Sequence, residues 1–239
     1  SMIDIQVLAS GSKGNCYKIT DGHSSLLIEA GIPLKKIKQG LNYRLSEIDG
    51  CLITHEHKDH CKAVEDIMSA GINCYMSFGT SEKLGFHGHR VMNRQQGKHF
   101  KVINTNWVVM PFEVEHDADE PLGFLIRNRE GERLVYITDS YYCRYKFPNL
   151  NYIMIECNYA IDILNKNIEL GRVPAVQKKR LLESHFSLHN VKKFLQANDL
   201  SKVKEIYLLH LSDRNSDAKR FKREIQELTG KMVRIAGDD

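Results

Sequence analysis

The sequence lacks several features that would indicate a small metal-stapled, secreted or membrane protein. It has six cysteines but no C-x-x-C pair, and this spacing argues against a zinc finger. Most of the cysteines sit in apolar stretches such as Gly50-Cys51-Leu52-Ile53, which is typical of buried free thiols in a reducing compartment. We find no signal peptide and no apolar run as long as a membrane span. We therefore expect a cytoplasmic protein with no membrane association.

The sequence also lacks internal repeats, low-complexity tracts and linkers rich in proline or serine. Its 239 residues are enough to bury a sizeable core, and 42% hydrophobic with 27% charged residues is ordinary for a globular protein. We therefore predict one domain spanning residues 1–239. The net charge of +4 is weak evidence for an anionic partner, because scattered surface lysines explain it equally well.

The order of the apolar segments predicts an α/β fold. Strands dominate the first half and helices the last third, and two β-rich halves that are each covered by helices suggest a layered α/β sandwich. We predict strands at residues 3–9, 16–20, 24–29, 51–54, 73–76, 100–103, 107–114, 123–127, 133–138, 152–156, 203–209 and 232–235. We predict helices at residues 33–41, 62–70, 161–170, 173–182, 188–197 and 213–228.

Side chains that can bind metal ions cluster directly after the predicted strand 51–54, where the sequence reads His55-Glu56-His57-Lys58-Asp59-His60. On an extended stretch, residues two apart point the same way, so His55 and His57 can bind one metal ion. The chain then turns into a helix, whose first residues Asp59 and His60 can face a second ion nearby. Such a pattern seldom arises by chance, and it predicts a metal site.

Three later strands are each followed by a single residue that can bind a metal ion. These residues are His116, Asp139 and His210. The ends of strands are where a sheet opens into loops and where functional sites collect. Each of these residues taken alone is better explained as an ordinary core or surface residue. Together with the preceding motif, they indicate two metal positions that are supplied by five histidines and two aspartates.

This pattern resembles the metallo-β-lactamase superfamily, and the resemblance covers essentially the whole chain. It implies a four-layer αβ/βα sandwich with the metal ions at one edge. It also implies that His55, His57 and His116 bind the first ion, that Asp59, His60 and His210 bind the second, and that Asp139 bridges the two.

A closer resemblance is to the YycJ/WalJ-type hydrolases, a family associated with DNA exonuclease activity and related to RNase Z and cyclic-phosphate phosphodiesterases. The matching segments are Ser10-Gly11-Ser12-Lys13-Gly14-Asn15, Glu29-Ala30-Gly31-Ile32, His116-Asp117-Ala118, Glu156-Cys157-Asn158, Ser184-His185-Phe186-Ser187 and His210-Leu211-Ser212. The chain departs from the family pattern at Cys61-Lys62, Asp139-Ser140-Tyr141, Tyr159 and Ser184. All seven metal ligands are present, so the departures bear on the substrate rather than on the chemistry.

Two ions held by histidine and aspartate suit zinc, with manganese or iron as alternatives. Two close ions lower the pKa of a bridging water and stabilise charge on the attacking and leaving oxygens, so we expect a bridging hydroxide as the nucleophile, oriented by Asp139. We also expect Asp59 to be a catalytic residue. A phosphodiesterase also needs a group that protonates a poor leaving group, and we assign this role to His185. The alternative is that His185 merely neighbours a helix cap.

Weaker signals concern the phosphate. The turn containing Ser10, Ser12 and Asn15 offers backbone N–H groups that could hold a phosphate, although a plain tight turn explains it equally well. Asn158 could hydrogen-bond within the site. Ser187 could contact the phosphate, but we favour a helix cap there.

The basic stretch Lys178-Lys179-Arg180, with Arg172 before it, could follow a nucleic-acid backbone, although a solvated helix face is the commoner explanation. Tyr141, Tyr142 and Tyr145 could stack on bases, but ordinary packing is the stronger alternative. His87 and His89 lie in a glycine-rich loop, and we predict that they are not metal ligands.

The sequence therefore predicts a dinuclear metal-dependent phosphodiester hydrolase, an exonuclease-like nuclease whose substrate is DNA. The alternative is a hydrolase of a small ester, thioester or cyclic phosphodiester on the same metals. A non-catalytic binding protein would be expected to have lost ligands, and none is lost. No obligate protein partner is implied.

Overall fold

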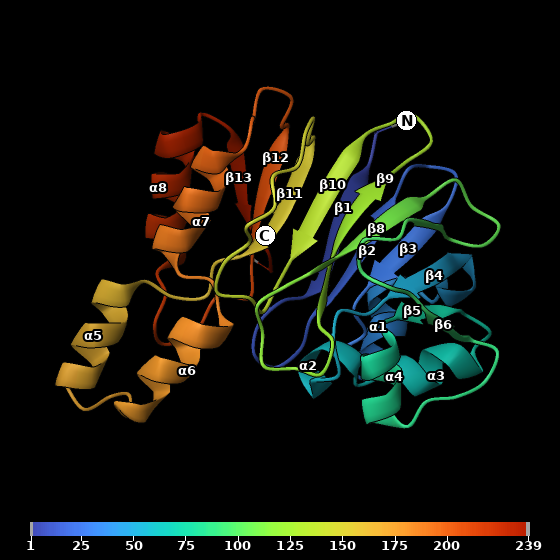
Figure 1. Cartoon of the computed structure of the whole chain (residues 1–239), viewed down its shortest axis with the longest axis horizontal. Coiled ribbons are helices and arrows are strands. Elements are labelled where there is room, and N and C mark those ends of the chain that lie inside the picture. The colour runs from blue at the N-terminus through green and yellow to red at the C-terminus, as the bar shows by residue number, and fades with distance from the viewer. Residues whose placement is uncertain (1, 238–239) are drawn as a thin grey trace. The chain divides into compact units, whose positions relative to one another are not determined.

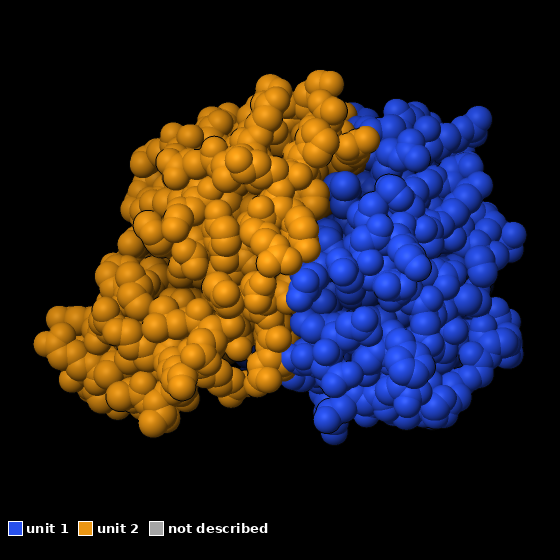
Figure 2. Space-filling view, viewed as in Figure 1, with its two compact units in different colours: residues 1–113, 118–132 blue, residues 114–117, 133–239 orange. Residues whose placement is uncertain are grey.

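The computed structural model describes residues 2–237, and the chain divides into two compact units. Unit 1 comprises residues 1–113 and 118–132, and unit 2 comprises residues 114–117 and 133–239, as Figure 2 shows by colour. The single domain expected from the sequence stays a prediction. Among the described residues, no helix is both long enough and apolar enough to cross a membrane.

Unit 1 is built on a sheet whose hydrogen-bonded order follows the sequence from β1 to β6 (Figure 1). Its strands are β1 (Asp4–Ala9), β2 (Cys16–Thr20), β3 (Ser25–Ile28), β4 (Ile48–Leu52), β5 (Cys74–Met76) and β6 (Val91–Asn93). The first three strands are antiparallel and the pairs from β3 to β6 are parallel. Strands β2 and β3 form a hairpin, and in its turn Asp21 Oδ1 accepts the N–H groups of His23 and Ser24 at 2.9 and 3.0 Å.

The helices of unit 1 are short. They are α1 (Leu34–Gly40), α2 (Lys58–Cys61), α3 (Val64–Ser69) and α4 (Phe78–Leu84), with a 3-10 turn at Leu45–Glu47. The helix predicted at residues 62–70 is confirmed as α3, which begins later than expected because the chain between α2 and α3 bonds to the backbone of Ala30. The N–H of Ala63 donates to Ala30 O at 2.8 Å, and the N–H of Ala30 donates to His60 O at 2.9 Å.

Helix α4 was not predicted, although its ends carry recognisable signals. Ser77 Oγ accepts the N–H of Thr80 at 3.1 Å, and Gly85 ends the helix in the left-handed conformation. Strand β6 was also not predicted. Unit 1 further contains β7 (Phe100–Lys101), β8 (Val108–Glu113) and β9 (Leu122–Arg127), which pair antiparallel in this order.

Unit 2 contains four strands that are parallel and adjacent in the order β10, β11, β12, β13. They are β10 (Arg133–Ile137), β11 (Tyr152–Glu156), β12 (Glu205–Leu209) and β13 (Met232–Ile235). Strand β11 is buried along its whole length, as expected for an apolar run in the middle of a parallel sheet. Because parallel strands end at the same edge, the residues that follow β10, β11 and β12 are brought together.

The helices of unit 2 are α5 (Ile161–Glu169), α6 (Val176–Ser184), α7 (Leu188–Ala197) and α8 (Ala218–Thr229). Helices α7 and α8 lie beside β12 and β13, whereas α5 and α6 lie beyond the end toward which β10 runs (Figure 1). The predicted helix 213–228 begins later than expected, because Asp217 caps it by accepting the N–H of Arg220 at 3.1 Å.

All six cysteines are free and buried, which confirms the expectation from their apolar surroundings. Burial raises the pKa of the Cys61 thiol to about 12 and that of the Cys143 thiol to about 11. Thiols in such surroundings are chemically inert at neutral pH.

Candidate metal centre

Unit 1 brings the histidines of the first motif together at the end of β4. His55 and His57 lie on extended chain, and their ring centroids are 4.7 Å apart. His60 follows in α2, and its ring centroid is 4.3 Å from that of His55. The Asp59 carboxylate oxygen Oδ2 lies 3.4 Å from His60 Nε2. In unit 1, His55 thus lies beside both His57 and His60, and Asp59 lies beside His60.

Glu29 is a part of this cluster whose role the sequence did not reveal. It is fully buried, and its Oε2 atom lies 2.5 Å from His60 Nδ1. Thr54 holds the carboxylate in place, since its N–H donates to Oε1 at 2.9 Å and its Oγ1 donates to Oε2 at 2.8 Å. A carboxylate on one imidazole nitrogen fixes the ring, and it makes the other nitrogen a better metal ligand. The sequence feature that could have revealed this role is the position of Glu29, a lone glutamate directly after the apolar strand β3.

The turn at residues 10–15 is hydrogen-bonded to the backbone of the metal motif. Asn15 is buried, its N–H donates to Asp59 O at 2.8 Å, and its Nδ2 atom donates to Gly11 O at 2.9 Å. Ser10 Oγ lies 2.7 Å from the hydroxyl of Tyr17, and Ser12 is exposed. Through these contacts, Asn15 holds the turn against the backbone of Asp59. Phosphate binding by this turn stays a prediction.

Gly31 makes a close approach of two backbones possible at the same place. A Cβ atom on Gly31 would overlap the carbonyl oxygen of Asp59, and the N–H of Gly31 donates to Asn15 O at 2.9 Å. The metal motif is thus packed directly against the segment that carries Glu29.

Unit 2 gathers a second cluster at the carboxyl edge of its parallel strands. Asp139 follows β10, Glu156 ends β11, and His210 follows β12. His210 Nδ1 lies 2.9 Å from Asp139 Oδ1 and 2.7 Å from Glu156 Oε2. Asp139 and His210 both have positive φ angles, 47° and 53°, which are uncommon for non-glycine residues.

His185, which ends α6, joins this cluster. Its Nδ1 atom lies 2.7 Å from Glu156 Oε2, and the N–H of Phe186 donates to Glu156 Oε1 at 2.9 Å. His116 is close as well, with Nε2 3.7 Å from Asp139 Oδ2 and its ring centroid 6.1 Å from that of His185. One buried carboxylate, Glu156, thus orients two predicted site histidines. The sequence matched Glu156 to a family pattern without assigning it this role.

The carboxylates control the protonation of both histidines. Burial by itself would lower the pKa of His210, but Asp139 and Glu156 outweigh this effect and raise the pKa to about 10 in the metal-free protein. For His185, burial likewise opposes the positive charge, and Glu156 followed by Asp139 raises the pKa above its ordinary value. The two imidazoles are therefore held with protons on the atoms that face Glu156.

Two further predicted residues have defined contacts. Asn158 Nδ2 donates to the carbonyl oxygen of His210 at 2.9 Å, so it fixes the backbone of a predicted ligand. Ser187 Oγ accepts the N–H of Asn190 at 3.1 Å and caps α7, which is the interpretation that the sequence favoured.

The donors in each cluster suit a divalent metal ion. In unit 1, ligand atoms of Glu29, His55 and His60 lie within 4.8 Å of one another, and in unit 2 those of Asp139, Glu156, His185 and His210 do so. Imidazole nitrogens and carboxylate oxygens are the usual ligands of zinc and neighbouring divalent metals. The imidazoles of His55, His60 and His210 are therefore of the kind that binds such an ion, whereas Glu29 and Glu156 hold imidazole nitrogens by hydrogen bonds.

These features agree with the family comparison. The Beta-lactamase superfamily domain matches residues 26–210, so the chain belongs to this superfamily and is a metal-dependent hydrolase by family. It is 28% identical over 233 residues to the Exodeoxyribonuclease YycJ of Bacillus anthracis, covering 88% of this chain and 83% of that protein.

Solved structures confirm the predicted metallo-β-lactamase fold. The metallo-β-lactamase fold protein YhfI from Bacillus subtilis has a TM-score of 0.74 at 16% identity, over 98% of this chain and 96% of that one. Human tRNase Z, short form, has a TM-score of 0.63 at 15% identity, over 99% of this chain and 97% of that one.

Proposed function

We propose that this metallo-hydrolase cleaves phosphodiester bonds in nucleic acid, with DNA as its substrate. The observation that carries the proposal is the contact of His185 with Glu156, in the same cluster as Asp139 and His210. A thioester hydrolase expels a thiolate, which departs without a proton, whereas a phosphodiesterase acting on DNA expels a poor alkoxide. A protonated imidazole beside the metal ligands meets that need. The resemblance to an exodeoxyribonuclease gives independent support.

We assign the metal ligands by the order of the family motif. His55, His57 and His116 would bind one ion, and Asp59, His60 and His210 a second, with Asp139 shared between them. When bound, the ions would supply an activated water and neutralise the charge that develops on the phosphoryl oxygens. Zinc is the favoured metal. Metal analysis of the replete protein should find two ions per chain, and fewer would contradict a dinuclear centre.

The protein groups then have distinct tasks. His185 would donate its proton to the departing oxygen, and Glu156 would hold the imidazole in position and keep it protonated. Glu29 would do the corresponding positioning for His60. Asn158 would keep the backbone of His210 in place.

The test uses the difference between two leaving groups. The metal-loaded protein is incubated with 5′-phosphorylated single- and double-stranded DNA, with bis-p-nitrophenyl phosphate and with a thioester. His185→Ala should lose DNA cleavage by about 100-fold or more, but much less turnover of bis-p-nitrophenyl phosphate, whose phenolate departs without a proton. His189→Ala on α7, an exposed histidine, is the matched control and should keep both activities.

Two outcomes would overturn the proposal. Turnover of the thioester without cleavage of either phosphodiester would identify a small-ester hydrolase. Loss of bound metal in His185→Ala would make His185 a ligand rather than a proton donor.

A further inference from the structure

Unit 2 contains two cavities that are lined by basic side chains from the segment 161–184, which includes α5 and α6. The first has a volume of about 360 Å³ and is lined by Asn167, Arg172 and Arg214. The second has a volume of about 570 Å³, and Lys179 and Arg180 of α6 line it together with His116 and Tyr141. None of these four basic residues belongs to the candidate metal clusters described above.

Arg214 of the first cavity is held by hydrogen bonds of both its side chain and its carbonyl oxygen. Arg214 Nη1 donates to Arg172 O at 3.1 Å, and the largely buried Asn167 donates from Nδ2 to Arg214 O at 2.8 Å. Arg172 and Arg214 are both exposed, and their positive charges beside one cavity favour an anion there. A phosphate is an anion that accepts paired hydrogen bonds from guanidinium groups.

The second cavity places cations next to a predicted metal ligand. His116 lines it directly, and the Tyr141 side chain is 39% exposed at its wall. Exposed aromatic rings beside basic residues are typical of single-strand binding sites, because bases stack on the rings while cations hold the backbone. Lys179 and Arg180 are both exposed, so they can move to meet a phosphate.

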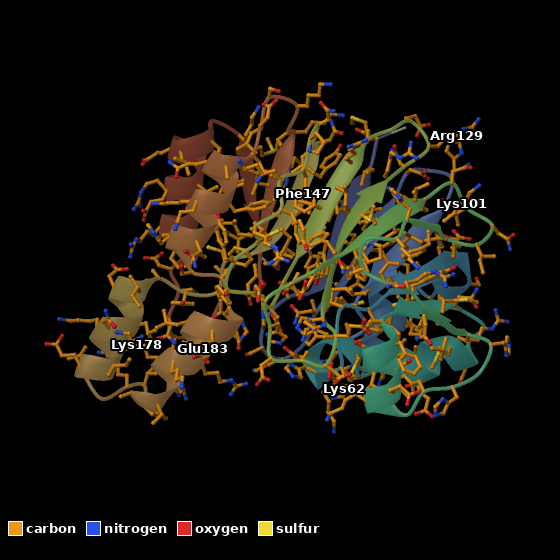
Figure 3. All side chains as sticks on the ribbon, viewed as in Figure 1. Lys62, Lys101, Arg129, Phe147, Lys178 and Glu183 are labelled. Atoms are coloured by element: carbon orange, nitrogen blue, oxygen red, sulfur yellow. The ribbon has the colours of Figure 1, made fainter. Side chains whose placement is uncertain are left out.

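Acidic residues also line the second cavity, and they limit how a strand could lie there. Glu115 and Asp117 flank His116, and Glu183 lies one helical turn after Lys179 on α6, the helix whose Lys178 and Glu183 are labelled in Figure 3. A phosphate would therefore be drawn to the exposed α6 side of the cavity. Glu183 would compete with it for Lys179.

Both cavities are lined by residues at or near predicted ligands. His116 lines the second cavity, and Arg214 of the first belongs to the loop that follows His210. Helix α5 is in turn tied to α8, because Arg220 Nη1 lies 2.8 Å from Asp162 Oδ2. The segment 161–184 lies beyond the end toward which β10 runs (Figure 1).

We propose that this segment, together with Arg214, docks a single nucleic-acid strand through its phosphates. Arg172 and Arg214 hold one backbone phosphate, Lys179 and Arg180 hold another, and Tyr141 stacks on a base. This inference rests on the proposed function and names the part of the protein that distinguishes a polymer from a small phosphodiester.

The test measures binding separately from cleavage. Fluorescence anisotropy is recorded with labelled single-stranded DNA and RNA oligonucleotides on the metal-loaded full chain carrying His185→Ala, at several salt concentrations. The pairs Arg172→Gln/Arg214→Gln and Lys179→Gln/Arg180→Gln should each weaken binding by roughly tenfold, and each lost phosphate contact should reduce the salt slope by about 0.7. Lys222→Gln/Arg223→Gln on α8 removes the same charge from exposed positions and should have little effect.

Glu183→Gln should have the opposite effect and tighten binding, because it frees Lys179 for the strand. With His185 intact, both pairs should hydrolyse bis-p-nitrophenyl phosphate as the unsubstituted protein does. The docking proposal would be overturned if both pairs of substitutions bound both oligonucleotides as tightly as the α8 control does. It would also be overturned if they lost as much small-diester turnover as oligonucleotide binding. Weakened binding in a protein that cleaves no phosphodiester would leave docking intact and refute the proposed function instead.

Discussion

Replacing Glu156 by glutamine tests how the cluster of unit 2 is held together. The Glu156 carboxylate accepts hydrogen bonds from His185 Nδ1 and His210 Nδ1, both at 2.7 Å, and from the N–H of Phe186 at 2.9 Å. Glutamine has nearly the same shape and keeps one acceptor oxygen, but it carries no charge. The substitution therefore separates the effect of the negative charge from that of packing.

The expected magnitude follows from the pKa of His210, which Asp139 and Glu156 raise, against the effect of burial, from 6.5 to about 10 in the metal-free protein. Each unit of difference between the folded and unfolded pKa corresponds to about 1.4 kcal/mol. If Glu156 supplies nearly half of the shift, its charge contributes about 2 kcal/mol to the free energy of unfolding. Because the folded pKa is raised, this contribution is complete below the unfolded pKa and is lost as the pH rises toward the folded one.

The assay is urea unfolding of the metal-free chain at about pH 6 and about pH 10, with the exposed Glu227→Gln of α8 as the charge control. We expect Glu156→Gln to cost about 2 kcal/mol at the lower pH and about 1 kcal/mol at the higher, where only a neutral hydrogen bond is weakened. Metal affinity should fall by about 10- to 100-fold. A cost that does not change with pH, or an unchanged metal affinity, would refute this reasoning.

Three further predictions concern other parts of the chain. Gly31→Ala should destabilise the protein by about 1–3 kcal/mol and lower its metal content, because the added methyl group overlaps the backbone of Asp59; unchanged thermal unfolding and metal content would contradict this. Ser187→Ala should cost about 1 kcal/mol in chemical unfolding through loss of the α7 cap, with DNA binding unaffected, and weaker DNA binding would favour a phosphate contact. A thiol reagent should modify none of the six cysteines until the protein unfolds, and rapid labelling of the native chain would show that a thiol is accessible.

Most of the strands and the main helices could be predicted because each is an apolar run of suitable period ended by a turn residue. The buried run of β11 and the hairpin at Asp21 are examples. The helix predicted at residues 62–70 begins only at Val64, because a distant backbone, that of Ala30, accepts the N–H of Ala63. A local pattern contains no information about such a partner.

The sequence by itself determined the residues that can bind metal and their order along the chain. His55, Asp139 and His210 each come shortly after the end of an apolar strand, and strand ends are where polar side chains reach a common edge of a sheet. Only the tertiary structure decided which carboxylates orient the histidines. Glu29 meets His60 across 31 residues of chain and Glu156 meets His210 across 54, so these contacts exist only once the strands have paired. Burial then makes each of these contacts strong, because a charge removed from water interacts mainly with the one partner that the fold places beside it.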